Sequence, residues 1–198
     1  MNMSFGGAEE FRAFKDEVRR RLEAREHRDI PESDLRRAAV MMLLMDREGE
    51  PHVLLTLRTE RVSSHKGQVA FPGGAVDPED ADHLDAAYRE TEEEVGIPRD
   101  LVEYIGRFDD YISIAGFHVF CHVGAVEYPF PCRVNEDEIE SCFTAPLSLF
   151  SEERCERIEL YNYRGDDYRV FFYRHEGYEI WGLTARILTD FCVKICGE

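Results

Sequence analysis

Three glutamates within one short stretch constrain this chain more than any other feature of its sequence. Residues 73–97 read GGAVDPEDADHLDAAYRETEEEVGI and place Glu90, Glu93 and Glu94 three and four positions apart. If the stretch is helical, the three carboxylates share one face over little more than a turn. Like charges at that spacing destabilise a bare helix, so the cluster needs a neutralising partner, and hard oxygen ligands suit a divalent cation. The alternative is a solvated acidic face, the commoner reason for a run of acids.

The opposite face of the same stretch supports the helix. Gly96 then provides a helix stop, and the turn at 71–74, Phe-Pro-Gly-Gly, lets the backbone approach a ligand closely. Apolar and small side chains recur at helical spacing and predict a face packed on a core, namely Leu84, Ala87, Tyr88, Thr91 and Val95.

This stretch resembles the signature box of the Nudix hydrolases. Gly74 matches the opening glycine of the box, and residues 89–97 match its end, with Thr91 where an apolar residue is more usual. The loop is one residue longer than the family pattern, so either Glu79 or Asp80 stands for the first glutamate of the box. The resemblance implies an α+β fold, an α/β/α sandwich around a mixed, partly antiparallel central sheet.

The resemblance also implies a metal-dependent site. Mg²⁺ or Mn²⁺ is expected on the carboxylates of Glu90, Glu93 and Glu94 with the carbonyl of Gly74, where it lowers the pKa of water and neutralises phosphoryl oxygens. The resemblance also implies a catalytic role for Glu93. The expected structural residues are Arg89, which pairs with an acid of the loop, Asp80 and Gly96.

A later acidic segment, 135–140, resembles the loop from which a carboxylate of the family reaches the metals or takes a proton from water. Glu138 is the first candidate for this catalytic role and Glu136 the second. A solvated loop is an equal alternative, because acids are ordinary loop residues.

A second motif lies directly upstream and narrows the substrate. Residues 54–74 resemble the accessory motif of the coenzyme A pyrophosphatase branch, but Ser63 stands where the motif has its second arginine. If that arginine meets a phosphate, Arg61 or Lys66 must replace it. The expected substrate-binding residues are Arg58, Arg61, His65, Lys66 and Gly73, although the four cations also fit a scattered surface set.

The two motifs together imply hydrolysis of coenzyme A or a derivative into 3′,5′-ADP and a phosphopantetheine product. The alternative within enzymes is a pyrophosphatase for ADP-ribose or another dinucleotide, because the box determines the reaction and not the leaving group. The alternative of another class is a nucleotide-binding domain that has lost the reaction.

Length and charge limit the remaining choices. The 198 residues suit one domain over 1–198, with a homodimer left open. A net charge of −17 argues against nucleic-acid or anionic-membrane partners. The start of the sequence lacks a basic segment followed by an apolar one, and no apolar run is long enough to span a membrane, so a cytoplasmic location is expected.

Hydrophobic spacing predicts an amphipathic helix over 8–27 and a final helix opening at Glu179. In the family that the chain resembles, the linker at 109–116 helps to shape the base pocket, so Tyr111 and Phe117 are candidates for stacking on a base, with core packing the alternative. The six cysteines contain no C-x-x-C pair and are expected to be reduced; a redox or metal pair at 192 and 196 is the weaker reading. Strands are expected at 38–45, 52–58, 102–108 and 117–127, with a late hairpin at 155–163 and 168–174.

Overall fold

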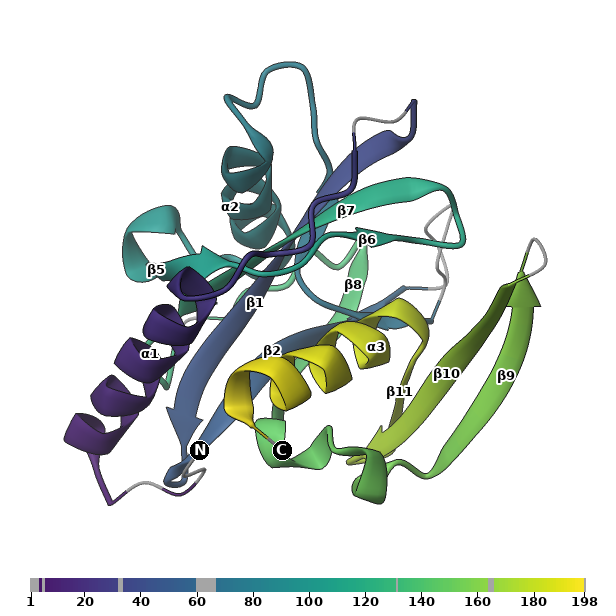
Figure 1. Cartoon of the computed structure of the whole chain (residues 1–198). Coiled ribbons are helices and arrows are strands. Elements are labelled where there is room, and N and C mark those ends of the chain that lie inside the picture. The colour runs from purple at the N-terminus through teal and green to yellow at the C-terminus, as the bar shows by residue number, and fades with distance from the viewer. Residues whose placement is uncertain are drawn as a thin grey trace.

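The computed structural model describes residue 4 and residues 6–31, 34–59, 67–130, 132–163 and 166–197. Figure 1 shows a large twisted sheet with helices on both sides and a smaller sheet that extends away from it. The elements of the first half are α1 (Ala8–Glu23), β1 (Arg36–Arg47), β2 (Glu50–Arg58), β3 (Val69–Ala70), β4 (Gly73–Ala75), α2 (His83–Val95) and η1 (Arg99–Leu101).

The second half begins with the strands β5 (Glu103–Arg107), β6 (Tyr111–Ile112), β7 (Phe117–Ala125) and β8 (Ile139–Pro146). It continues through η2 (Leu147–Leu149), η3 (Glu152–Arg154), β9 (Arg157–Tyr163), β10 (Asp166–His175), β11 (Tyr178–Trp181), α3 (Gly182–Phe191) and the π-helical turn η4 (Cys192–Cys196).

The central sheet is mixed, as the resemblance predicted. Its main path runs β3-β2-β1-β7-β5, and β1 lies parallel to β7 while the other pairs along this path are antiparallel. The short strand β4 pairs with β1, and β8 pairs with β2. The glycine pair before the acidic helix is therefore held against the middle strand of the sheet.

Strand β1 separates the two layers of helices because its side chains alternate between them. Met41 and Leu43 belong to the cluster that includes the buried face of α2. Met42 and Leu44 belong to the cluster that includes α1 and α3. The predicted α/β/α sandwich is confirmed.

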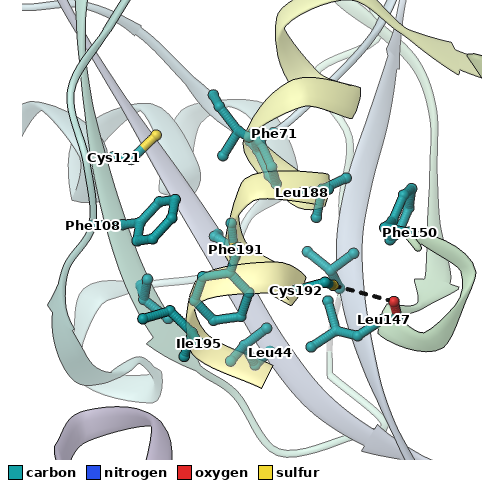
Figure 2. Close-up of a cluster of buried hydrophobic side chains, with 14 of the residues drawn as sticks. Leu44, Phe71, Phe108, Cys121, Leu147, Phe150, Leu188, Phe191, Cys192 and Ile195 are labelled. Atoms are coloured by element: carbon teal, nitrogen blue, oxygen red, sulfur yellow. Dashed lines mark hydrogen bonds between the residues drawn. The ribbon is translucent and has the colours of Figure 1, made fainter. Parts of the chain in front are cut away.

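Figure 2 shows the cluster on the α3 side, where aromatic rings fill the space between helix and sheet. Phe108 meets Phe191 edge to face at 5.4 Å between ring centroids. The buried thiol of Cys192 donates a hydrogen bond to the carbonyl of Leu147 at 3.4 Å. This cysteine thus ties the end of α3 to the turn after β8, in a packing role.

The smaller sheet has the order β11-β10-β9 and corrects one prediction. Residues 179–181 form a strand and not the first turn of a helix, because Glu179, Ile180 and Trp181 pair with β10. Gly182 adopts a φ of 65° at the junction, and the helix begins there. Trp181 stacks on Phe172 at 5.8 Å between ring centroids.

Three further predictions change. The first helix ends at Glu23, four residues short of the predicted end. Cys132 and Cys142 form a disulfide, so the expectation of reduced thiols is wrong for this pair, which joins the connection between β7 and β8 to strand β8 itself. Tyr111 is buried and donates a hydrogen bond from its hydroxyl to Asp190 at 2.8 Å, which excludes it from stacking on a base in this structure.

In the part of the chain that is described, no helix is long and apolar enough to cross a membrane.

Candidate active site

Helix α2 is shaped by signals within its own sequence. Asp82 accepts hydrogen bonds from the backbone N–H groups of Leu84 and Asp85, both at 2.8 Å, and caps the first turn. Gly96 adopts a left-handed φ of 69° and ends the helix. Glu94 contacts Gly73 of β4 and Arg58 at the end of β2, and Glu90 lies beside Gly74. The buried side of the helix carries Ala86, Ala87, Tyr88, Thr91 and Val95.

The two glycines of β4 allow unusually close approaches. A Cβ added at Gly73 would lie 2.3 Å from the carbonyl oxygen of Ala39 on β1. A Cβ added at Gly74 would lie 2.4 Å from the carboxyl carbon of Glu90. The first glycine is therefore needed for the backbone, and the second leaves room for a glutamate of α2.

Glu94 is the most deeply buried of the three glutamates, with 2% of its surface exposed. Its two oxygens accept hydrogen bonds from the Arg58 Nη1 group at 2.7 Å and the Gly73 N–H at 3.1 Å. Burial raises its pKa to about 7, even though both partners favour the carboxylate. Arg58, expected to bind substrate, thus holds a buried carboxylate here.

Arg89 organises the other acids of the helix. It forms two hydrogen bonds with Asp80, at 2.9 and 3.0 Å, so Asp80 and not Glu79 is its partner in the loop. Its Nη1 group also contacts Glu90 at 2.8 Å and Glu93 at 3.0 Å. The guanidinium beside Asp80 lowers the pKa of that carboxyl, while burial raises the pKa of Glu90.

The acidic loop lies beside the same helix. The Glu138 carboxylate is 3.6 Å from the Nη2 group of Arg58, and its carbonyl accepts the Thr59 N–H at 2.8 Å. The Asn135 N–H donates to the Glu94 carbonyl at 3.0 Å. Arg58 therefore lies between Glu94 and Glu138, whereas Glu136 is exposed on the turn. No local signal in the sequence indicated these long-range contacts.

The chemistry of the donor set fits a hard divalent cation. Among the described residues, two guanidinium groups, those of Arg58 and Arg89, form ion pairs with five carboxylates, so the acids outnumber the bases there. The five carboxylates belong to Asp80, Glu90, Glu93, Glu94 and Glu138. As the side chains stand, no three metal-binding groups among the described residues converge on one point. In this arrangement the carboxylates form ion pairs with the two arginines.

Several predicted residues lack a placement in the site. Arg61, His65 and Lys66 lie outside the described residues, so their expected role in binding the substrate remains a prediction. Gly73 uses its N–H for Glu94, and Phe117 is half-buried beneath the guanidinium of Arg36, 4.7 Å from its ring centroid.

Comparison with known proteins identifies the relatives of this chain. A family model described as NUDIX domain matches residues 35–165. Proteins named "Uncharacterized Nudix hydrolase NudL", from Citrobacter koseri and from Escherichia coli strain K12, are each 41% identical over 161 residues, covering 81% of this chain and 83% of the relative. A crystal structure of a MutT/nudix family protein from Enterococcus faecalis has a TM-score of 0.52 at 17% identity, covering 98% of this chain and 76% of that chain. At that identity the structure supports the fold alone.

Proposed function

The chain belongs to the Nudix hydrolase family and is a pyrophosphohydrolase, and on that premise we propose that it cleaves the pyrophosphate bond of coenzyme A and its derivatives. The products are 3′,5′-ADP and the matching 4′-phosphopantetheine compound. The observation that carries the proposal is the contact of Arg58 with Glu94 at 2.7 Å, because it joins the accessory motif of the coenzyme A branch to the signature box.

In this proposal Mg²⁺ or Mn²⁺ is held by Glu90, Glu93 and Glu94 with the carbonyl of Gly74. The bound ion lowers the pKa of water and neutralises charge on the phosphorus oxygens. Asp80 holds Arg89, whose Nη1 group contacts both Glu90 and Glu93.

Glu138 is the proposed general base. A general base must lie within hydrogen-bond reach of the proton it takes, directly or through one water. Its position across Arg58 from the buried Glu94 supports this role, because it puts an accessible carboxylate next to the acids of the helix. Glu93, whose exposed side chain also contacts Arg89, keeps its proposed catalytic role, and Glu136 remains the second candidate for the base.

The first part of the accessory motif acts as scaffold in this fold. Leu54 and Leu55 are buried, and the Thr56 hydroxyl donates to the Ala70 carbonyl at 3.1 Å. These contacts tie β2 to β3, directly before the Phe71–Gly74 turn. The motif therefore supports the site geometry, and the choice of coenzyme A over ADP-ribose rests on its resemblance to that branch.

The test is a parallel assay of coenzyme A and ADP-ribose with Mn²⁺, with nucleotide products separated by chromatography. Faster release of 3′,5′-ADP from coenzyme A is expected, and a chelator should abolish it. Faster cleavage of ADP-ribose would overturn the substrate assignment. Absence of cleavage of both, with folded protein and metal present, would overturn the proposed catalytic site itself.

A further inference from the structure

A disulfide closes the acidic loop between strands β7 and β8. Cys132 comes directly before residues 133–138, and Cys142 lies beyond them on β8, which pairs with β2 (Figure 1). The two sides of the loop are therefore joined by a covalent bond across a sequence separation of 10. Because Glu138 belongs to this loop, a bond that holds the loop also restrains its carboxylate.

The acidic loop lies on the last turn of α2. The Arg133 N–H donates to the Val95 carbonyl at 2.9 Å, and the Asn135 N–H donates to the Glu94 carbonyl at 3.0 Å. Residues 133–138 are all described, and none of their side chains is fully buried. A segment held by a few backbone hydrogen bonds and little buried surface opens locally at a small cost in free energy. The disulfide is therefore the strongest restraint on the loop.

Small molecules can reach this disulfide. Cys132 and Cys142 are both partly exposed, whereas three of the four free cysteines are buried. The remaining free cysteine, Cys155, is partly exposed. Thiol–disulfide exchange begins when a thiolate attacks one sulfur of the disulfide, so it requires access to that sulfur, and exposed disulfides are often the regulatory ones.

We propose that the Cys132–Cys142 disulfide is a reversible redox switch of the acidic loop and that, resting on the role proposed above for Glu138, its reduction lowers turnover. A small thiol attacks one sulfur, and the other cysteine leaves as a thiolate that takes up a proton. A second thiol then attacks the small-molecule sulfur of the mixed disulfide and releases the first cysteine. Two small thiols are thereby oxidised to one disulfide, and their two electrons reduce the cysteine pair to two thiols.

The substrate of the proposed reaction contains such a thiol. Coenzyme A ends in a free thiol, whereas an S-acyl derivative does not. Free coenzyme A therefore belongs to the class of reductant that opens the disulfide, and an S-acyl derivative does not. For this reason the two redox states have to be compared on an S-acyl derivative.

Hydrogen exchange of the full chain tests the switch without substrate or metal. Reduction by dithiothreitol should speed exchange of the Arg133 and Asn135 amides roughly tenfold, and reoxidation should restore the slower rate. Cys132→Ser should exchange at the faster rate under both conditions. Cys155→Ser is the matched control, because it removes a partly exposed thiol outside the loop, and it should respond as the wild type does. Equal exchange in both states, or a response that persists in Cys132→Ser, would overturn the proposal.

Turnover of acetyl-coenzyme A with Mn²⁺ tests the effect on catalysis. The oxidised chain should be roughly tenfold faster than the reduced chain, because a displaced general base loses part of its contribution to the rate. Glu138→Gln should abolish this difference, since the loop then carries no base at that position. Equal turnover of the two states would refute the effect on catalysis. If neither state turns over while the exchange response is present, the switch is supported and the proposed hydrolysis is refuted.

Discussion

The substitution Gly74→Ala tests the proposed site at its closest contact. An added Cβ would lie 2.4 Å from the carboxyl carbon of Glu90 and 2.5 Å from each of its oxygens. Ordinary contact between such atoms is about 3.4 Å or more, so the carboxylate must retreat by roughly 1 Å. Because it is the end of a flexible side chain, it can move without unfolding the helix.

The expected loss follows from that displacement. A misplacement of roughly 1 Å in a catalytic constellation lowers the rate about 100-fold, which corresponds to about 2.7 kcal/mol of transition-state stabilisation. The unfolding free energy should change little. By contrast, a Cβ at Gly73 would meet the main-chain carbonyl of Ala39 at 2.3 Å, so Gly73→Ala should destabilise the fold itself.

The assay is turnover of the preferred substrate at saturating Mn²⁺, together with urea unfolding of each variant. Gly7→Ala is the control, since its added methyl meets nothing within 4 Å. Glu90→Asp shortens the side chain that the new methyl displaces, so the losses of Gly74→Ala and Glu90→Asp should combine less than additively. Full turnover in Gly74→Ala, or strict additivity of the pair, would refute the reasoning.

Three further substitutions test other parts of the structure. Glu94→Gln should lower turnover by several orders of magnitude with the fold intact, whereas Glu92→Gln on the exposed side of α2 should not; near-normal turnover of Glu94→Gln would remove Glu94 from the metal site. Burial alone would raise the pKa of Asp109, but Lys194, the Arg28 N–H and Arg25 hold it at about 2, below its ordinary 3.8. That shift stabilises the fold above pH 4 by about 2 kcal/mol and is lost as the pH falls toward 2, so Asp109→Asn should lose this amount at pH 7 in urea unfolding, and an unchanged pH profile would contradict it. Cys132→Ser should lower stability by about 3 kcal/mol, because the disulfide closes a loop with a sequence separation of 10, and thermal melting with and without dithiothreitol measures this; equal melting curves would contradict the expected stabilisation.

The helix at the centre of the site was predictable because its signals are local. The apolar spacing behind the glutamates and the stop at Gly96 both lie within one segment of the sequence. The resemblance to the signature box left two adjacent acids, Glu79 and Asp80, as candidates for its first glutamate. Only the path of the loop backbone decides between them, and it favours Asp80.

The contacts that assemble the rest of the site were not predictable, because they join distant segments. Arg58 and Glu94 are 36 positions apart, and the disulfide partners Cys132 and Cys142 follow no known spacing rule. The same limit explains the error at Glu179. A short segment with mixed preferences became a strand because β10 offered it a free edge, which overrides local propensity.

The fold accommodates the acidic cluster because Arg58 and Arg89 pair with different carboxylates of it. Arg89 commits one edge of its guanidinium to Asp80 and reaches Glu90 and Glu93 with its Nη1 group. Arg58 serves the buried Glu94, whose other hydrogen bond comes from a neutral backbone N–H. A buried carboxylate with only a neutral donor would take up a proton more readily, since burial disfavours its charged form. Arg58 therefore opposes the burial that raises the pKa of Glu94, and this contact links the end of β2 to the last turn of α2.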